Sequence, residues 1–531
     1  MAGAKQGSAR RSTTKAGKGR AAKPKAGARG AGRGRGAAEE GGLSATAWAL
    51  MALVLIGAIT VLRLTVNAAD LIPVHFDEAQ YWAYGQELAW GYFSKPPGVG
   101  VVIRVATDLG GDTLFAMRFA SPLCHAVIAL ALFALGRRLF DARTGFWAAL
   151  AYALAPGVSV SALIMSTDPV MMAAWALGLL AMVAAMEREA AGRDARLAWA
   201  GVGLAIGLGS LAKYTMLAMP ASAFAYGLFS ARGRAFGGMM IAGGVGLLVL
   251  APNLLWNAAN GFATVTHVAE DADPGQGYFN PLKLAEFAGA QLGVIGPVVF
   301  LAILAAFWHW RDWVGDWRMR LLAWQTGLLL FAILGLAFVT RAQPNWAAPA
   351  YIAGCLFATR WLLISGRPRL LGLQAGIGVV AALAVWAAAA LYADRAGELP
   401  RWGDPFKKMR IAEPFCGPAL AAMAEEGAEV LLSNDRRRLS ECMFLGGLGW
   451  DEIAVWNPEI AAENHHEMVA TLLPGDSRLM LLAVMGDPAP VVAAFEEARL
   501  VDEHRFATHA DRDYPLALWL VSGFRDYDTE Y

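Results

Sequence analysis

Hydrophobic residues in this chain are gathered into long runs that short polar loops separate. Between Leu43 and Leu391 we count about eleven such runs, each close to the length of about 20 residues that a helix needs to cross the hydrocarbon core of a bilayer. The runs cover residues 44–66, 114–135, 144–165, 168–187, 197–213, 214–231, 236–256, 286–308, 321–340, 346–364 and 370–391. This pattern predicts a polytopic α-helical membrane protein.

The composition agrees with a membrane location. Hydrophobic residues make up 57% of the chain and charged residues 17%, whereas soluble domains contain about 45–50% apolar and about 25% charged residues. A soluble enzyme of this size is therefore excluded, as are collagen-like and disordered chains.

Arginines in the loops between the runs follow one alternation along the chain. Most of them stand in every second loop, and the loops between hold fewer basic residues. They are Arg137, Arg138 and Arg143, then Arg188, Arg193 and Arg196, then Arg232 and Arg234, then Arg311, Arg318 and Arg320, and finally Arg367 and Arg369. Because basic loops stay in the cytoplasm, we expect a cytoplasmic N-terminus. The protein then lies in the cell inner membrane, and the chain beyond Leu391 lies in the periplasm.

The near-zero net charge conceals opposite charges at the two ends of the chain. Residues 1–42 hold eleven Lys and Arg and two Glu, while residues 392–531 hold thirteen Lys and Arg and twenty-five Asp and Glu. The first segment has almost nothing to bury, so we expect a disordered cytoplasmic tail and not a nucleic-acid-binding arm. We expect three parts: this tail, a transmembrane domain over 43–391 and a periplasmic domain over 392–531.

The last of these parts is typical of a small soluble α/β domain. Short apolar runs at 429–432 and 479–484 predict strands, and 490–498 predicts an amphipathic helix with a proline at its start. The segment contains no recognisable catalytic motif.

Two pairs of residues in the last segment are ambiguous from the sequence. We expect His465 and His466, with Asn464, to be surface residues and not metal ligands. Cys416 and Cys442 can pair if this segment lies outside the cytoplasm, but the sequence leaves that pairing open.

Ionisable residues at membrane depth are costly and are therefore functional candidates. On this topology they fall on the outer side, at five places along the chain. They are Asp77 with Glu78, then Lys95, Asp168, Lys213 with Tyr214, and His267. Each has a simpler explanation by itself: Asp168 precedes a proline and could cap a helix, and Lys95 could extend to the interface. Together these explanations weaken, because all five places lie on one face.

Carboxylates combined with lysines favour one kind of reaction. A carboxylate can accept the proton of an attacking hydroxyl, and lysines can stabilise the charge on a departing phosphate. The sequence lacks GxxxxGK[ST] and a GxGxxG element between a strand and a helix, so a soluble nucleotide donor lacks support. These features indicate transfer of a sugar from a lipid phosphate.

Several motifs carry a resemblance to a known family. They are Asp77-Glu-Ala-Gln-Tyr-Trp82, Gly91-Tyr-Phe-Ser-Lys-Pro-Pro97, Thr167-Asp-Pro169, Lys213-Tyr214, Pro252-Asn-Leu-Leu-Trp-Asn257 with His267, residues 286–291 and Pro344-Asn-Trp-Ala-Ala-Pro-Ala350. Together they resemble the GT-C superfamily of membrane glycosyltransferases. The nearest likeness is to bacterial members of glycosyltransferase family 39, grouped with the aminoarabinose and galacturonosyl transferases of lipopolysaccharide. The match covers roughly residues 45–365.

The resemblance implies inverting transfer from a polyprenyl-phosphate sugar, and it implies roles for individual residues. Asp77 is similar to the catalytic base, and Glu78 would assist it or orient the acceptor. Lys95 is similar to the residue that binds the donor phosphate, and Lys213 would add a second positive charge. The other carry-overs are Asp168 and Tyr214 in the donor cavity and, more weakly, His267 and Asn345.

One position departs from the family pattern. Some aminoarabinose transferases have an acidic residue directly before the lysine of Lys-Pro-Pro, where it contributes to a metal site, and this chain has Ser94. We therefore expect catalysis without a metal or another cofactor. The acceptor stays open between lipid A, another envelope glycan and a protein hydroxyl. The alternatives from other classes are a transporter without transferase activity and a non-catalytic lipid-binding protein.

Overall fold

The computed structural model describes residues 43–230, 236–271, 280–340 and 342–527, with side chains left out for 268–271. Residues 1–42, expected as the basic tail, fall outside this range, as do Arg232 and Arg234. Residues from Ser44 onward form one contact unit.

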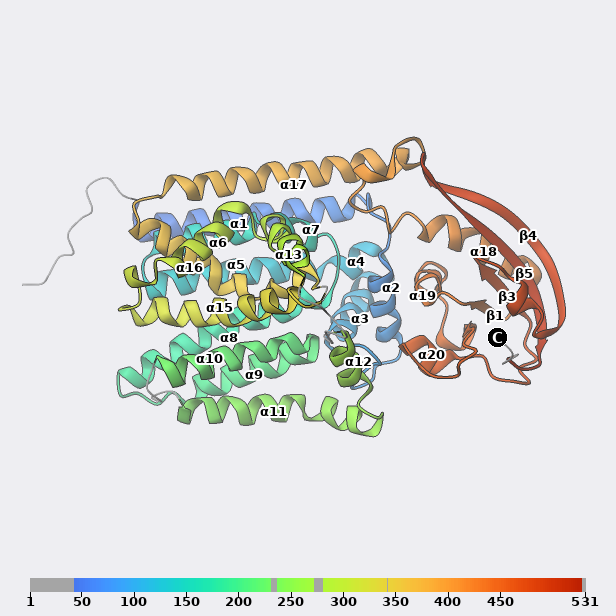
Figure 1. Ribbon diagram of the computed structural model, residues 1–531, viewed down its shortest axis with the longest axis horizontal. Helices are drawn as coiled ribbons and strands as arrows, with labels where there is room; N and C mark the ends of the chain where they lie inside the picture. The colour runs from blue at the N-terminus through green and yellow to red at the C-terminus, as the bar shows by residue number, and fades with distance from the viewer. Residues whose placement is uncertain (1–42, 231–235, 272–279, 341, 528–531) are drawn as a thin grey trace, which may run out of the picture. The chain divides into compact units, whose positions relative to one another are not determined.

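Helices make up the part of the chain that the hydropathy pattern assigns to the membrane (Figure 1). Within the described part of the chain, six helices are long and apolar enough to cross a bilayer. The number rises to seven if one bent pair of helices is counted as a single span. The six spans are α1 (Ala45–Ala68), α4 with α5 (Leu114–Arg118 and Ala120–Leu139), α8 (Thr167–Ala190), α11 (Phe236–Ala259), α15 (Trp317–Ala337) and α17 (Arg369–Arg395, continued to Glu398).

The other expected spans are shorter or broken helices. They are α6 and α7 (Ala142–Ala153 and Pro156–Ser161), α9 (Arg196–Ala212), η1 and α10 (Tyr214–Leu217 and Ala218–Phe229), α13 and α14 (Pro281–Val294 and Pro297–Trp308), and α16 (Ala350–Ile364). Prolines at the first positions of α7 and α14 stop the preceding helices, and α13 and α14 meet at 120°. The structure thus has at least six apolar spans, and the count of eleven stays a prediction.

Between the first two spans the chain forms two helices that carry polar residues, α2 (Phe76–Gln86) and α3 (Gly98–Gly110). A capping box starts α2: His75 Nδ1 accepts a hydrogen bond from the Asp77 amide at 3.1 Å, and Glu78 Oε2 accepts one from the His75 amide at 3.1 Å. These bonds satisfy amides that a helix start leaves unpaired. A short helix, α12 (Ala263–Asp271), follows α11.

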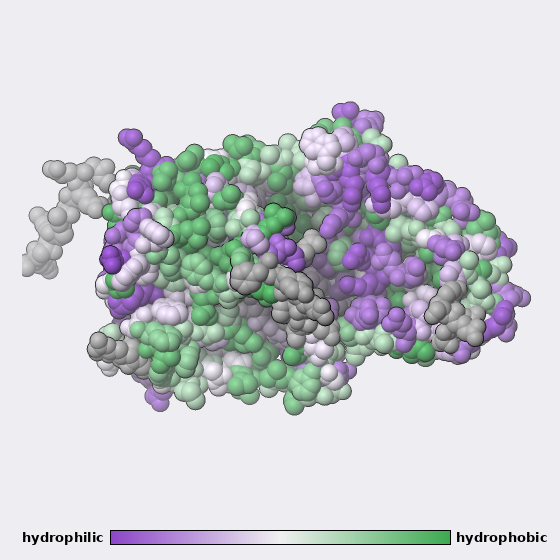
Figure 2. All heavy atoms as spheres, viewed as in Figure 1, coloured by the Kyte–Doolittle hydropathy of each residue, from purple (hydrophilic) through white to green (hydrophobic). Residues whose placement is uncertain are grey.

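The C-terminal part contains a five-stranded sheet of order β2-β1-β3-β5-β4 (Figure 1). Strand β1 (Val430–Ser433) is parallel to β2 (Ile453–Val455) and β3 (Met480–Val484), while β5 (Arg512–Phe524) is antiparallel to β3 and to β4 (Phe495–His509). The helices here are α18 (Ala412–Glu426), α19 (Arg436–Gly446), α20 (His465–Ala470) and α21 (Ala489–Val492). In Figure 2 hydrophobic residues dominate the helical part and hydrophilic residues the surface over the sheet.

Two expectations for this part are wrong. The helix expected over 490–498 ends at Val492, because Phe495 begins β4 and pairs with Phe524, with the two ring centres 5.3 Å apart. Tertiary packing overrides the helical pattern there. His466 is fully buried and Asn464 nearly so, and they are therefore not surface residues. Asn464 caps α20, where its Oδ1 accepts from the Glu467 amide at 3.2 Å.

Cys416 and Cys442 form a disulfide that joins α18 to α19. This answers the question that the sequence leaves open.

Candidate active site

A cavity of about 530 Å³ opens where the start of α2, the loop before α3 and the start of α8 come together. Segments far apart in the chain line it. Its lining residues are Asp77, Tyr81, Ser94, Lys95, Pro96, Ser166, Thr167, Asp168, Lys213, Tyr214, Thr215, Ile333, Leu336, Gln343, Asn345 and Trp346. Six of the eight residues singled out from the sequence, Asp77, Lys95, Asp168, Lys213, Tyr214 and Asn345, therefore meet in one cavity.

Asp77 is held at the mouth of the cavity by the way α2 begins. It is the second residue of the helix, and 42% of its side chain is exposed. An aspartate in the first turn also interacts favourably with the positive end of the helix dipole. His75 Nδ1 lies 3.7 Å from Asp77 Oδ2. This nitrogen already accepts the Asp77 amide hydrogen, so it carries no proton and the contact is not an ion pair.

Tyr81 lies one helical turn after Asp77 on the same face of α2. Burial raises the pKa of its phenol well above the ordinary value, and the charge of Asp77 adds to the effect. The phenol therefore stays neutral in the cavity wall and keeps a proton to donate. The sequence analysis missed this residue, although its spacing from Asp77 could have revealed it.

Glu78 points away from the cavity into the protein. Its side chain is fully buried, and its carboxylate accepts two hydrogen bonds from the Arg118 guanidinium, at 2.9 and 2.7 Å. A third comes from the Met165 amide at 2.7 Å. In the described part of the chain Glu78 does not line the cavity, so the structure does not bring it to the same place as Asp77. Arg118, its partner, carries no signal of this role in the sequence.

Asp168 lies in the first turn of α8, but it does not cap this helix. Its Oδ1 accepts a hydrogen bond from Lys213 Nζ at 2.7 Å, and its Oδ2 accepts one from Asn345 Nδ2 at 2.8 Å. The side chains of Asp168 and Lys213 are 13% and 21% exposed. One carboxylate therefore joins three segments of the cavity wall.

Tyr214, next to Lys213, belongs to a chain of neutral hydrogen bonds. Its hydroxyl donates to Asn253 Oδ1 at 2.6 Å and accepts from Asn257 Nδ2 at 3.1 Å. Asn253 Nδ2 in turn donates to the Trp90 carbonyl at 2.6 Å. This chain fixes the turn after α9 against α11 and the loop before α3.

Lys95 enters the cavity from a tight turn, in which the Tyr92 amide donates to the Lys95 carbonyl at 3.0 Å. The turn approaches the end of α9 closely at Gly98. A Cβ atom there would lie 2.7 Å from the Leu211 carbonyl oxygen, and backbone atoms do not yield easily. A glycine at this position thus lets the Lys95 loop approach Lys213.

His267 is not among the described residues that line the cavity, but it lies close to one of its loops. Its ring lies 5.8 Å from that of Phe93, two residues before Lys95. It therefore contacts the loop that carries Lys95.

The acidic groups of the cavity do not suit a tightly bound metal ion. Among the described side chains, no three of His, Cys, Asp or Glu lie close enough to share one, whereas protein metal sites usually supply three or more ligands of these types. Ser94 lines the cavity where an acidic residue would be needed. We therefore derive no step through a metal.

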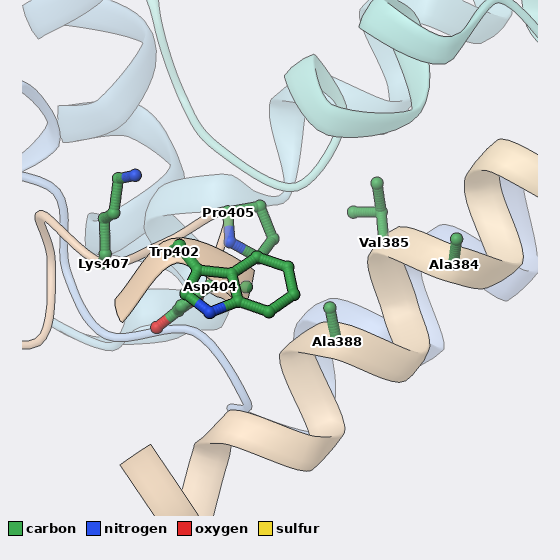
Figure 3. A pocket seen from close by; sticks show the side chains of 8 residues that line it. Ala384, Val385, Ala388, Trp402, Asp404, Pro405 and Lys407 are labelled. Carbon is green, nitrogen blue, oxygen red and sulfur yellow. The ribbon is translucent and has the colours of Figure 1, made fainter. Parts of the chain in front are cut away.

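A second hollow offers less chemistry. It measures about 430 Å³ and lies between α17 and the segment after it, where Trp402 and Pro405 face the small side chains Ala384 and Ala388 (Figure 3). Its carboxylate, Asp404, is fully buried and already bonded to Arg410 at 3.0 Å. The cavity at Asp77 is the better candidate.

Known proteins resemble this chain both in sequence, over the segments that form the cavity, and in fold. A family model described as dolichyl-phosphate-mannose-protein mannosyltransferase matches residues 94–256. The lipid A galacturonosyltransferase RgtD of Rhizobium johnstonii is 32% identical over 395 residues, which cover 74% of this chain and 82% of that protein.

More distant matches are aminoarabinose transferases. Undecaprenyl phosphate-α-4-amino-4-deoxy-L-arabinose arabinosyl transferase 1 of Pseudomonas fluorescens is 29% identical over 321 residues, so the chain spans about half of its length (56%). The crystal structure of ArnT from Cupriavidus metallidurans bound to undecaprenyl phosphate aligns with a TM-score of 0.61 at 17% identity, covering 89% of this chain and 98% of that one. Its fold is thus shared. The chain belongs to the GT-C superfamily of membrane glycosyltransferases, in the family that modifies lipid A and lipopolysaccharide.

Proposed function

We propose that this protein transfers a sugar from a polyprenyl-phosphate carrier to lipid A or another part of lipopolysaccharide. The observation that carries the proposal is the cavity in which Asp77 meets Lys95 and the Asp168–Lys213 pair. The names of the relatives, a lipid A galacturonosyltransferase and aminoarabinose transferases that use undecaprenyl phosphate, support the same donor and acceptor.

In the proposed reaction Asp77 acts as the base. Its carboxylate takes the proton of an acceptor hydroxyl while the hydroxyl oxygen forms a bond to the anomeric carbon. The bond from that carbon to the phosphate oxygen breaks on the opposite side, and its electron pair leaves with the polyprenyl phosphate. The anomeric configuration is inverted. No general acid is required, because a phosphate is already a good leaving group.

The lysines of the cavity are proposed to bind the donor phosphate. Lys95 supplies the first charge. Lys213 supplies the second, oriented by its 2.7 Å bond to Asp168, and such fixed charges stabilise the phosphate as it departs. Asn345 and Tyr214 hold the same wall, and His267 supports the Lys95 loop through Phe93.

Glu78 is proposed to assist Asp77 indirectly. Its bonds to Arg118 and to the His75 amide fix the start of α2, so the carboxylate of Asp77 keeps its direction. Glu78 is then a positioning residue, and orientation of the acceptor falls to other groups.

The location and the domain division are also proposals. We place the protein in the inner membrane with residues 1–42 as a cytoplasmic tail, 43–391 as a transmembrane catalytic domain of about eleven helices, and 392–531 as a periplasmic domain. The arginine alternation supports this orientation. The Cys416–Cys442 disulfide also supports it, because disulfides persist outside the cytoplasm.

The two main alternatives have less support. A transporter does not account for membership in a glycosyltransferase family. A protein acceptor has in its favour only the name of a family model that matches residues 94–256, a range that omits Asp77.

The test is a transfer assay with the purified full chain. It is incubated with undecaprenyl phosphate carrying galacturonic acid, aminoarabinose or mannose, and with lipid A or an unstructured serine- and threonine-rich polypeptide. We expect lipid A to gain the mass of one sugar with at least one donor. Modification of the polypeptide alone, or the absence of transfer from every donor, would contradict the proposal.

A further inference from the structure

The C-terminal part of the chain is strongly acidic, but it presents a run of three arginines, Arg436 to Arg438, at the start of α19. Residues 392–531 hold twenty-five acidic and thirteen basic residues. A run of three cations in such a segment raises the question of what each of them pairs with.

Arg438 has an internal structural role. Its guanidinium is buried and forms ion pairs with Glu441 and, at 3.7 Å, with Asp435. The Arg438 guanidinium is therefore held by carboxylates of α19 and its N-cap residue.

Arg436 and Arg437 instead contact α2, the helix that carries Asp77. Arg436 Nη1 donates a hydrogen bond to Gln80 Oε1 at 2.6 Å, and Arg437 Cζ lies 5.1 Å from the centre of the Phe76 ring. Arg436 is half-buried and Arg437 exposed. Within the described part of the chain neither forms an ion pair with a carboxylate.

Helix geometry places these charges close to the proposed base. Phe76 and Gln80 are four residues apart and share one face of α2, and Asp77 and Tyr81 share the next, about 100° around the helix. The second face lines the cavity. Neither arginine lines the cavity, but both contact the face of α2 that lies next to the one carrying Asp77.

The packing around them fixes α19 against α2. Trp450 Nε1 donates to the Ala83 carbonyl at 3.1 Å, and the rings of Trp82 and Phe444 meet edge to face at 5.5 Å. The disulfide of Cys442 ties α19 to α18. The position of the two guanidinium groups relative to Asp77 is thus built into the fold.

We propose that Arg436 and Arg437 bind an anionic group, a phosphate or a carboxylate, of the glycan acceptor. This inference rests on the proposed function and adds to it the part of the protein that recognises the acceptor. Guanidinium groups pair with both anions through two parallel hydrogen bonds. The acceptor hydroxyl must reach Asp77, so an anion bound beside Asp77 belongs to the acceptor, while Lys95 and Lys213 serve the donor from within the cavity.

The experiment compares wild type with the double variant R436Q/R437Q in the full chain. The acceptors are lipid A with its phosphates, enzymatically dephosphorylated lipid A, and dephosphorylated lipid A extended by acidic sugars. For the acceptor that supplies the anion, we expect the double variant to raise the apparent KM on the order of tenfold, the size of one charged hydrogen bond. The KM for the donor stays unchanged. A higher KM for phosphorylated lipid A would identify phosphate as the bound anion. A higher KM for the acceptor with acidic sugars would identify carboxylate.

Three further variants separate anion binding from a structural effect. R505Q removes an exposed arginine of β4 that pairs with Asp513, and it should leave both KM values unchanged. R437K keeps the charge and should recover part of the acceptor affinity, and R437Q tests the exposed residue alone, without disturbing the bond to Gln80.

An equal KM for every acceptor in wild type and double variant would overturn the inference, as would an increase in the KM for the donor. A direct binding titration of phosphorylated lipid A and of dephosphorylated lipid A with acidic sugars, without donor, separates this inference from the proposed function. Loss of binding in the double variant supports the arginine site even if no transfer occurs. Unchanged binding of both lipids would reject the arginine site even if transfer takes place.

Discussion

Lys213 Nζ and Asp168 Oδ1 lie 2.7 Å apart and join residues 45 positions apart in the chain at the wall of one cavity. The pair lies between α9 and α8, and Asn345 holds the second carboxylate oxygen at 2.8 Å. Because both side chains are mostly shielded from water, they cannot easily exchange this contact for hydration.

We predict that Asp168 and Lys213 act as one unit. Lys213→Ala removes a charge from the proposed phosphate site, and Asp168→Asn lets Lys213 lose its position. Each should raise the donor KM, on the order of tenfold, and the double variant should be little worse than either alone, with a coupling of about 1–2 kcal/mol. Donor KM values for the four proteins measure this. Strictly additive losses would contradict the prediction.

Gly98 should matter because of the space it leaves. Gly98→Ala places a Cβ atom 2.7 Å from the Leu211 carbonyl oxygen and should displace the Lys95 loop. We expect a higher donor KM that resembles the effect of Lys95→Ala. Gly57→Ala is the matched control, because a Cβ there meets nothing within 4 Å. Equal donor KM values in the two glycine variants would refute the role of this close approach.

The buried Glu78–Arg118 pair should determine stability. Glu78→Gln leaves the Arg118 charge without its partner, and breaking a buried ion pair costs about 3–5 kcal/mol. A large fall in the thermal unfolding temperature in detergent is expected. The control is Glu87→Gln, which changes an exposed residue at the end of α2 and should leave the unfolding temperature unchanged. If Glu78→Gln kept full stability and still lost activity, Glu78 would have a direct part in the chemistry.

His466 should make the C-terminal part of the chain sensitive to acid. Burial lowers the pKa of His466 to about 3, and His465 and Arg436 add to the effect. Its Nε2 lies within hydrogen-bonding distance of Ser440 Oγ, at 3.0 Å. The imidazole takes up its second proton more readily in the unfolded chain, where its pKa is about 6.5. The contribution of His466 to the free energy of unfolding is therefore complete above about pH 6.5. It falls by about 1.4 kcal/mol per pH unit as the pH drops toward 3.

Hydrogen exchange of the α20 region between pH 7.5 and 5 measures this sensitivity. Faster opening at the lower pH is expected in wild type, and the effect should be smaller in His466→Gln. The same pH dependence in both proteins would show that another group is responsible.

The sequence predicted most of the cavity because its residues carry charge where charge is rare. Asp77, Lys95, Asp168 and Lys213 stand out in apolar surroundings, and the topology alone placed them on one side. It did not predict that Glu78 turns inward, since adjacent residues of a helix point about 100° apart and the direction depends on Arg118. Nor did it single out Tyr81, which follows Asp77 by one helical turn and lines the same cavity.

Long apolar helices were predicted better than the C-terminal domain. α1, α8 and α11 lie within a few residues of their expected ranges, because hydrocarbon requires a long apolar run. The helix expected over 490–498 ends at Val492, and from Phe495 onward long-range pairing with Phe524 makes a strand. The contact of Arg436 with Gln80 joins residues 356 positions apart, and no local pattern carries it.

The most direct test of the central claim is sugar transfer by Asp77→Asn in the purified full chain. The variant keeps the size of the side chain but cannot accept the proton, so transfer to lipid A should fall by at least about 100-fold. Thermal stability and donor binding should be unchanged. The control Asp108→Asn removes an exposed carboxylate that pairs with Arg104 on α3 and should keep full activity. Transfer at the wild-type rate by Asp77→Asn would contradict its role as the base.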